Sequence, residues 1–235
     1  MGSGAGELDG VRKFKAIAEK WTAQIEENYL PELTMWRSIF VIFFLIGKDA
    51  ESVGYGNISR RIPGDNGGRG LEFIITASQT GHLKQLSVAD YVHVTRSIPE
   101  QNIVYYVPGT FDPEHRKPSS ETMTHFGVYD ALPDANFVFH VHSKIIWDAR
   151  YRLNIPETPT NVPYGTPAMA AATRALLAKP GVAEGKIMAM GGHRDGIVTW
   201  GKIANEAGLT VLDYNARAVR LNAPQKAIFY KVPSG

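Results

Sequence analysis

The sequence feature that most constrains the fold is a short apolar segment, Phe137 to His142, which reads FVFHVH and ends in two histidines. Its length and apolar character predict a buried β-strand. Because side chains alternate between the two faces of a strand, His140 and His142 are expected to project from the same face. Two neighbouring imidazoles are suited to a divalent metal ion. Histidines at the end of an apolar strand can also simply be packed and hydrogen-bonded, so the local pattern leaves both interpretations open.

A segment about 20 residues before this strand, Ser119 to Glu121, supplies a carboxylate and two hydroxyl groups. A helix is expected to begin within 118–122, with Ser119 or Ser120 as its N-cap. Glu121 then falls in the first turn, where the helix dipole favours a negative charge. Ser-Ser-Glu is also an ordinary way to begin a helix. A third ligand elsewhere in the chain is therefore needed to favour a metal site.

Length and charge limit the broad class of protein. At 235 residues the chain can form one domain with a sizeable core, and no linker-like stretch divides it. We expect a single domain over 1–235, with a flexible N-terminus at 1–6 and a C-terminal tail at 220–235. Charge is nearly balanced, with 25 basic and 23 acidic side chains. We therefore expect neither nucleic acid nor a membrane as a partner.

The absence of cysteine limits the chemistry of the chain further. It excludes disulfides, thiolate ligands and a cysteine nucleophile, so any metal must be bound through nitrogen and oxygen. It is compatible with a reducing cytoplasm, and residues 1–6 lack the pattern of a signal peptide, so we expect a cytoplasmic protein. The apolar run Ile39 to Ile46 is far shorter than the ~20 residues that cross a bilayer. We expect it in the core or at a subunit interface.

Apolar periodicity predicts a mixture of helices and strands along the chain. The expected helices are an amphipathic helix at 7–29, a helix at 33–46 that Gly47 stops, a capped turn at 86–90, a short helix at 144–151, a helix at 168–177 with Thr166 as N-cap, and a final helix at 202–219. The expected strands form a hairpin within 54–63, after a glycine-bracketed turn, and at 71–76. Further strands are expected at 91–95, 102–107 and 137–142, and a second hairpin at 186–190 and 197–200. Such an irregular order predicts a mixed sheet whose faces are covered by helices.

Two loops are candidate binding elements. Ala77-Ser-Gln-Thr-Gly81 carries hydroxyl groups and a glycine, which can cradle an anion, although many such loops bind nothing. His193 lies in a glycine-rich turn at a strand end, an accessible place for a metal ligand. His93 lies within an alternating strand, and we expect it to be structural.

Four segments, in order along the chain, resemble the class II aldolase and adducin head-domain family. They are Gly56-Asn-Ile-Ser59, Ile75 to Gly81, Lys117-Pro-Ser-Ser-Glu121 with His140-Val-His142, and Gly192-His193 with Gly196 to Gly201. The resemblance spans about 33–219. It implies a three-layer α/β/α sandwich with a central mixed, largely antiparallel sheet, and it implies a homotetramer.

The resemblance also implies a metal site and a catalytic residue. Its ligands would be His140, His142 and His193, which bind Zn2+, or Mn2+, Co2+ or Fe2+, and leave open positions as a catalytic site requires. Glu121 matches the acid/base of the family. The family's phosphate-binding positions are similar to Asn57, Thr80, Gly81, Ser119 and Ser120. Because the loop at 78–81 is one residue longer than usual, either Ser78 or Thr80 would meet the phosphate. The family's sugar-phosphate enzymes also use a tyrosine, for which Tyr151, Tyr164 and Tyr230 are candidates.

The implied function is a divalent-metal-dependent aldolase that cleaves a small ketose phosphate, or a related hydroxy-carbonyl compound, through an enediolate. Epimerisation of a pentulose phosphate at carbon 4 and dehydration of a sugar phosphate are alternatives that use the same site. A non-catalytic, adducin-like binding domain is an alternative of another class. The presence of all three histidines with Glu121 argues against it, since a purely structural domain has no need of that set. The fold alone does not decide between these functions.

Overall fold

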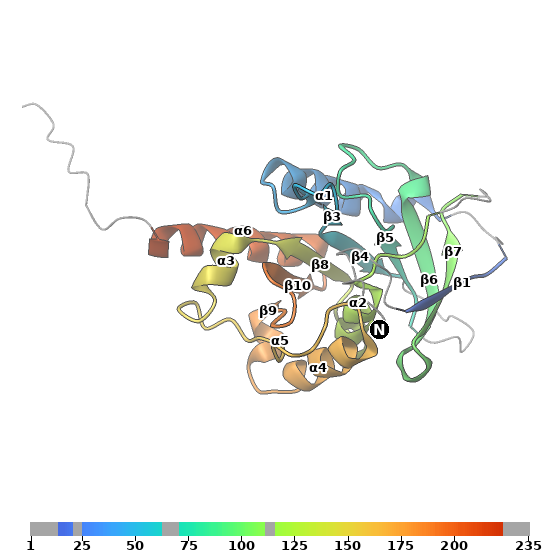
Figure 1. Ribbon diagram of the computed structural model, residues 1–235. Helices are drawn as coiled ribbons and strands as arrows, with labels where there is room; N and C mark the ends of the chain where they lie inside the picture. Colours follow the sequence, from blue (N-terminus) through green and yellow to red (C-terminus); the bar gives the residue numbers. More distant parts are fainter. Residues whose placement is uncertain (1–13, 21–24, 63–70, 111–115, 223–235) are drawn as a thin grey trace, which may run out of the picture.

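An eight-stranded mixed sheet lies at the centre of the computed structural model, which describes residues 14–20, 25–62, 71–110 and 116–222 (Figure 1). The strands are β1 Lys15–Ala18, β2 Gly47–Lys48, β3 Gly54–Tyr55, β4 Asn57–Arg61, β5 Phe73–Thr76, β6 Tyr91–Ile98, β7 Ile103–Pro108, β8 Phe137–His142, β9 Ile187–Ala189 and β10 Gly196–Gly201. The helices are α1 Pro31–Ile42, α2 Thr122–Ala131, α3 Lys144–Ala149, α4 Pro167–Leu177, α5 Val182–Gly185 and α6 Ala204–Asn222, with 3-10 turns η1 Glu27–Tyr29, η2 Val88–Asp90 and η3 Pro99–Gln101.

The strand order in the main sheet is β1-β7-β6-β5-β4-β8-β10-β9, and β2 and β3 form a separate ribbon. Only the pairing of β1 with β7 is parallel among the described strands, so the sheet is mixed and largely antiparallel, as predicted. Both predicted hairpins are present as the antiparallel pairs β4–β5 and β9–β10. Strand β8 therefore lies in the interior of the sheet, between β4 and β10.

Helices cover both faces of the sheet and complete three layers (Figure 1). Helices α1 and α6 lie over one face, and α2 and α4 lie over the other. The alternation along β8 follows these layers, because Phe137, Phe139 and Val141 join the core beneath α1 and α6 while Val138 joins the core beneath α2 and α4. His140 and His142 continue the Val138 side of the strand. Each face thus has its own apolar core, and both histidines emerge on the side of α2.

The predicted helix at 7–29 is wrong over its described part. Lys15–Ala18 forms the edge strand β1, which pairs with Ile103 to Tyr106 of β7, and only Glu27–Tyr29 has helical geometry. Residues 7–13 and 21–24 lie outside the described part of the chain. The free backbone edge of β7 outweighs the helical spacing of a few apolar side chains, because pairing satisfies a row of backbone groups.

Several boundaries also differ from the prediction. Helix α1 ends at Ile42 rather than near Ile46, and Phe44 adopts a left-handed conformation with φ 55° that reverses the chain before β2. The last helix continues to Asn222. Thr166 caps α4 as predicted, since its side chain accepts a hydrogen bond from the backbone N–H of Met169. Among the described residues, no helix combines the length and apolar character needed to cross a bilayer.

Candidate metal centre and its cavity

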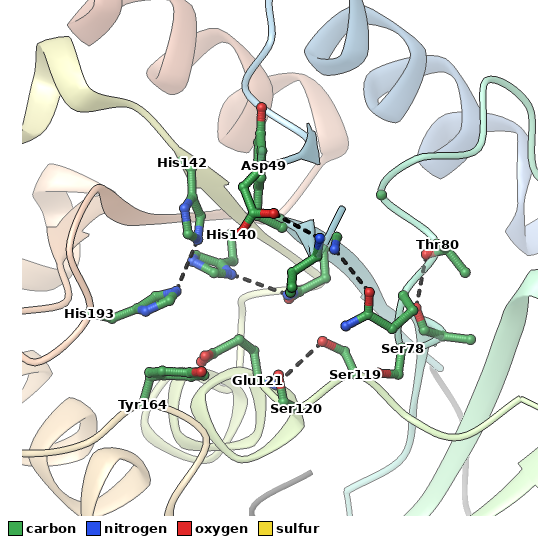
Figure 2. Close-up of a pocket in the computed structure, with 18 residues that line it drawn as sticks. Asp49, Ser78, Thr80, Ser119, Ser120, Glu121, His140, His142, Tyr164 and His193 are labelled. Atoms are coloured by element: carbon green, nitrogen blue, oxygen red, sulfur yellow. Dashed lines mark hydrogen bonds between the residues drawn. The ribbon is translucent and has the colours of Figure 1, made fainter. Parts of the chain in front are cut away.

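Three histidines from two parts of the sheet meet at the end of β8 (Figure 2). His140 and His142 end β8, and His193 lies in the turn that leads into β10. One nitrogen atom from each imidazole lies within 4.8 Å of the others. The Nε2 atoms of His142 and His193 are 2.9 Å apart. The structure therefore brings together the three side chains that were predicted to be ligands.

The histidine cluster fits a divalent metal ion. Zinc bound tetrahedrally at ~2.0–2.1 Å from nitrogen separates its ligand atoms by roughly 3.3 Å, which the spread of these imidazoles accommodates. Nε2 of His140 is buried and has no hydrogen-bond partner in the described part of the chain. A buried imidazole nitrogen normally has a partner, and an ion at the centre of the cluster would supply one.

Pairing of the strands positions the cluster and leaves room for it. In the sheet, His140 lies opposite Asn57 of β4, and His142 lies opposite Gly196 of β10. A Cβ atom at position 196 would lie 2.7 Å from Cδ2 of His193 and 3.3 Å from Nε2 of His140. The absence of a side chain at Gly196 therefore leaves space for both imidazoles.

Burial favours the neutral form of His140 and of the neighbouring His125. It lowers the pKa of His140 well below the usual value, and the nearby imidazoles of His142, His193 and His125 lower it further. Burial alone lowers the pKa of His125 to about 3. Neutral imidazole is the form that binds a metal ion.

Glu121 lines the same cavity as the three histidines and is 2% exposed. Its Oε2 atom accepts a hydrogen bond of 2.7 Å from the hydroxyl of Thr124, one turn further along α2. Figure 2 shows the carboxylate beside the histidine cluster, next to Tyr164. A carboxylate fixed in this way is placed to transfer a proton to or from a ligand in the cavity.

The cavity is lined by residues from separate segments of the chain (Figure 2). They are Asp49, the residues 53–57, 77–81 and 119–121, His140, His142, Tyr164 and His193. None of these lining residues is lysine or arginine. An anion bound against them would rely on hydroxyl groups, backbone N–H groups and the N-terminus of α2.

Two aromatic side chains pack on the histidines, and one of them was predicted from the sequence. The ring of Tyr55 lies 5.0 Å from that of His142 at an interplanar angle of 26°, and the ring of Tyr164 lies 4.1 Å from that of His193 at 33°. Tyr164 was one of three candidate tyrosines, but Tyr55 was not. Tyr55 follows a glycine in a short ribbon, where no periodic pattern marks it.

The other two candidate tyrosines are placed differently. Tyr151 is 62% exposed, and its hydroxyl donates a hydrogen bond to Glu157. Tyr230 lies outside the described residues. Of these candidates, Tyr164 is the one that the structure places in the cavity wall.

The loop at 77–81 contributes two hydroxyl groups with different surroundings. The hydroxyl of Thr80 donates a hydrogen bond of 2.8 Å to the carbonyl oxygen of Ala77, and Thr80 is 3% exposed. Ser78 also lines the cavity. Gly81 allows a close backbone contact, because a Cβ atom there would lie 2.1 Å from the carbonyl oxygen of Gly47.

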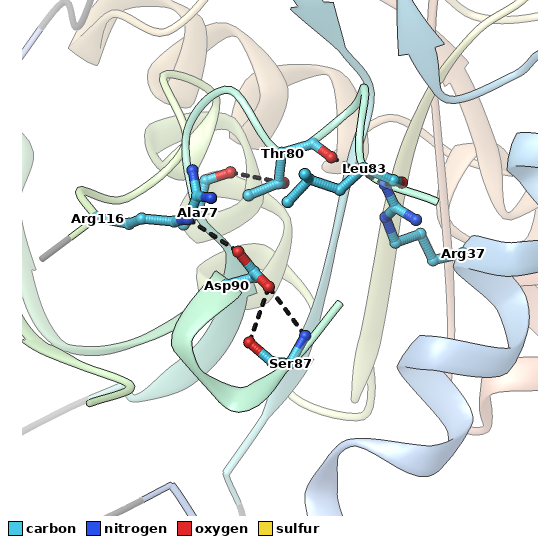
Figure 3. Close-up of polar contacts among 7 residues, drawn as sticks. All are labelled: Arg37, Ala77, Thr80, Leu83, Ser87, Asp90 and Arg116. Carbon is cyan, nitrogen blue, oxygen red and sulfur yellow. Dashed lines mark hydrogen bonds and ion pairs between the residues drawn. The ribbon is translucent and has the colours of Figure 1, made fainter. Parts of the chain in front are cut away.

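A buried arginine holds this loop from behind (Figure 3). Arg37 of α1 is 2% exposed, and its guanidinium donates a hydrogen bond of 2.8 Å to the carbonyl oxygen of Thr80. The same group also donates to the carbonyl oxygens of Gly81, Leu83 and Lys84. The helix that carries Arg37 thus fixes the backbone of the loop, a contact that no local sequence pattern predicts.

The predicted capped turn holds the start of the same loop, at Ala77 (Figure 3). Oδ2 of Asp90 accepts hydrogen bonds of 2.9 Å from both the backbone N–H and the hydroxyl of Ser87. Its Oδ1 forms an ion pair of 2.8 Å with Arg116. The carbonyl oxygen of Asp90 also accepts a hydrogen bond from the N–H of Ala77, so the first residue of the loop is tied to this turn.

The predicted N-cap of α2 is wrong by one or two residues. The helix begins at Thr122, its cap position is Glu121, and no side chain caps it. Ser119 instead accepts a hydrogen bond of 3.3 Å from the backbone N–H of Glu121. Ser119 and Ser120 remain in the cavity wall at the N-terminal end of α2, where the helix dipole favours an anion.

Two further predicted positions differ in their surroundings. The amide of Asn57 lies between His140 and His125. Its predicted contact with phosphate stays a prediction. His93 forms a contact of 2.7 Å with Glu72 and is not among the residues that line the cavity, in keeping with a structural role.

A mixed sheet between two helical layers, with three histidines converging at the end of an interior strand, defines the class II aldolase fold. The family model described as Class II Aldolase and Adducin N-terminal domain matches residues 45–218. The chain belongs to this family.

Solved structures of this fold resemble the chain at low sequence identity. L-fuculose-1-phosphate aldolase from Thermus thermophilus is 18% identical with a TM-score of 0.56, over 81% of this chain and 90% of that one. A sugar-phosphate aldolase from Thermotoga maritima is 16% identical with a TM-score of 0.56, over 81% and 91%. The N-terminal class II aldolase domain of a Thermoplasma acidophilum protein is 16% identical with a TM-score of 0.52, over 86% and 97%. Comparison with curated protein sequences gives no match.

Proposed function

We propose that this protein is a divalent-metal-dependent carbon–carbon lyase of the class II aldolase type, acting on a small ketose phosphate or a related hydroxy-carbonyl compound. The observation that carries the proposal is the convergence of His140, His142 and His193 with Glu121 on one cavity, with a buried imidazole nitrogen directed into the cluster. A binding domain without chemistry has no need of this set, because each buried polar group has a desolvation cost.

The three histidines would hold Zn2+, or Mn2+, Co2+ or Fe2+, since neutral nitrogen ligands suit each of them. When bound, such an ion is a Lewis acid that polarises a carbonyl group and stabilises negative charge on the oxygen atoms of the substrate. Three protein ligands leave positions open for those oxygen atoms. The imidazole groups carry no negative charge, so they would weaken the Lewis acidity of a bound ion less than carboxylate ligands would.

Glu121 would transfer the proton at the carbon atom that gains electron density when the carbon–carbon bond breaks. Its hydrogen bond from Thr124 holds the carboxylate in one orientation within the cavity. Tyr164, whose ring packs at an angle on that of His193, would donate a hydrogen bond to the oxygen atom of the departing aldehyde fragment. These roles need no movement of the backbone, because Glu121 and Tyr164 both line the cavity.

Ser119, Ser120 and the loop at 78–81 would bind the phosphate group of the substrate. The support for this is their place in the cavity wall and the N-terminus of α2 beside them. Arg37 lies behind the loop and adds a positive charge to that side of the cavity. Binding the phosphate there would orient the carbonyl end of the substrate toward the histidines.

The first test is metal content and proton exchange in the purified full-length protein. We expect about one divalent ion per chain, lost in a double variant with His140→Ala and His142→Ala. Glu121→Gln should keep the ion but lose exchange of the substrate α-proton with deuterated water, because the amide cannot accept that proton. A wild-type protein that neither contains nor takes up a divalent ion would overturn the proposal, and normal exchange in Glu121→Gln would overturn the role of Glu121.

Product analysis distinguishes the lyase from its nearest alternatives. Release of an aldehyde and a three-carbon phosphate from ketose phosphates identifies the aldolase. Formation of an epimer without release, or of a dehydrated sugar phosphate, identifies the alternative enzymes. A metal-loaded protein inactive on all of these compounds would favour an adducin-like binding domain.

A further inference from the structure

The buried side chain of Asn57 connects His140, one of the three clustered histidines, to His125, a further histidine that no motif identified. Nδ2 of Asn57 lies 3.1 Å from Nδ1 of His140, and Oδ1 of Asn57 lies 2.6 Å from Nε2 of His125. The exposed fractions of Asn57, His140 and His125 are 6%, 1% and 0%. The asparagine amide is therefore held by two imidazoles, away from solvent.

The hydrogen-bonded chain continues beyond His125. Nδ1 of His125 lies 2.6 Å from the hydroxyl of Ser59, which lies 2.8 Å from the hydroxyl of Tyr129. Asn57 and Ser59 are two residues apart on β4, and His125 and Tyr129 are four residues apart on α2, so each pair shares one face of its element. The periodicities of the strand and the helix thus bring five side chains, from His140 to Tyr129, into one continuous hydrogen-bonded chain.

Each interior member of this chain donates one hydrogen bond and accepts another, so the hydrogen atoms run in one direction. In the arrangement of the structure, Nε2–H of His125 donates to Oδ1 of Asn57, and the amide of Asn57 donates to Nδ1 of His140. His140 then carries its hydrogen atom on Nε2. That is the buried atom that lacks a partner among the described residues.

A metal ion at Nε2 of His140 requires the opposite direction. The nitrogen that binds the ion must be unprotonated, so neutral His140 must carry its hydrogen atom on Nδ1 and donate it to an acceptor. A half-turn of the Asn57 amide would present Oδ1 to His140 and Nδ2 to His125. Nε2 of His125 would then accept, and its Nδ1–H would donate to Ser59.

We propose that Asn57 and His125 are positioning residues for the ligand His140, and that metal binding reverses the whole hydrogen-bonded chain from His140 to Ser59. The inference rests on the metal site of the proposed function. The reversal changes no net charge, since each imidazole remains neutral and exchanges one ring hydrogen for the other. Ser59 can accept from His125 after the reversal, because its own hydroxyl can donate to the carbonyl oxygen of Val138, at 3.4 Å, or to Tyr129.

A matched pair of variants at position 125 tests the positioning role through metal affinity. The amide of His125→Gln can replace Nε2 as either donor or acceptor toward Asn57, whereas His125→Leu fills similar volume without a polar atom. Zn2+ and Co2+ affinities of the full-length proteins would be measured by competition with a chelator. We expect a dissociation constant raised about 10- to 100-fold in His125→Leu and by less than about threefold in His125→Gln.

His93→Gln is the control, because it alters another histidine contact, the partly buried one with Glu72, away from the cavity. We expect its metal affinity to match the wild type. Wild-type affinity in His125→Leu, or an equal loss in the leucine and glutamine variants, would overturn the positioning role. Urea unfolding of the metal-free variants distinguishes the positioning role from a purely structural one. A purely structural role of His125 would lower the unfolding midpoint and leave metal affinity unchanged.

The reversal itself is tested in the wild-type protein, which avoids any loss of folding. Histidine 15N chemical shifts distinguish the two neutral tautomers. We expect His125 to change from the Nε2–H to the Nδ1–H tautomer when Zn2+ is added, and His140 to carry hydrogen on Nδ1 in the metal-bound protein. An unchanged tautomer of His125 in a protein that has bound zinc would overturn the reversal. A wild-type protein that binds no metal would instead overturn the proposed function.

Discussion

The two halves of the cavity satisfy their polar groups in opposite ways. In the histidine half, formed by His140, His142 and His193, a buried nitrogen atom of His140 has no partner among the described residues. In the hydroxyl half, formed by the loop at 78–81 with Ser119 and Ser120, the hydroxyl of Thr80 is already bonded to its own backbone. The histidine half is complete only with a ligand, whereas much of the hydroxyl half is held together by the protein itself.

The two halves of the cavity are also held in place by different contacts. The histidines are fixed by strand pairing and by the chain through Asn57. The loop of the hydroxyl half is fixed by Arg37, whose guanidinium binds carbonyl oxygens and so leaves them unavailable to a ligand. A substitution that alters one half of the cavity should therefore leave the structure of the other half unchanged.

The largest expected effect is on stability, from Arg37→Met. Removal of the guanidinium leaves buried carbonyl oxygens of the loop without their donor, and we expect the free energy of unfolding to fall by about 3 kcal/mol. Metal affinity should stay within about threefold of the wild type, because the histidine half is held separately. Urea unfolding and chelator competition measure the two quantities. Arg217→Met, which removes an exposed ion pair with Asp213, is the control and should change stability by less than about 0.5 kcal/mol.

A parallel loss of metal affinity and stability in Arg37→Met would show that the two halves are not independent. Retention of wild-type stability would contradict the role of Arg37 in holding the loop.

A smaller effect, confined to the histidine half, is expected from Gly196→Ala. The new methyl group would lie 2.7 Å from Cδ2 of His193, so the imidazoles must shift. We expect metal affinity to fall about tenfold, equivalent to ~1.4 kcal/mol, as measured by chelator competition. Gly185→Ala is the matched control, since a Cβ atom there meets nothing within 4 Å. Equal metal affinity in both glycine variants would show that the cluster tolerates movement.

The smallest effect is expected from Thr80→Val, which removes one hydroxyl and keeps the shape of the side chain. Its hydrogen bond to Ala77 is lost, and we expect stability to fall by about 1 kcal/mol. Affinity for inorganic phosphate, measured by calorimetry on the metal-loaded protein, should change by less than twofold. Ser78→Ala should weaken phosphate binding more than Thr80→Val does. The reverse order would show that Thr80 exchanges its backbone partner for the anion.

Much of the site was predictable because its residues lie at regular spacings. Alternation along β8 places His140 and His142 on one face whatever the rest of the fold, and the glycine-rich turn marks His193. Thr166 before Pro167 gave a correct helix start for a similar reason, since a cap is a local interaction. Local patterns of this kind predict the same geometry whatever the tertiary contacts around them.

Features that depend on distant partners were not predictable. The segment at 15–18 has helical spacing but becomes β1 because the edge of β7 is available to it. Arg37 reads as an ordinary helix residue, and its role appears only when the loop at 80–84 folds over it. His125 and Asn57 are 68 residues apart in the sequence, so only the packing of α2 on the sheet brings them into contact.

The position of β8 between β4 and β10 has a consequence for the order of events during synthesis of the chain. His140 and His142 are made before His193, and β10, which pairs with them, follows His193 directly. The complete ligand set therefore appears only after residue 193 and strand β10 have left the ribosome, and it depends on contacts of large sequence separation, which form slowly. A truncated chain that ends before residue 193 would lack both the third ligand and the strand that orders the first two. Tight binding of metal should accordingly be one of the last steps of folding rather than the step that nucleates it.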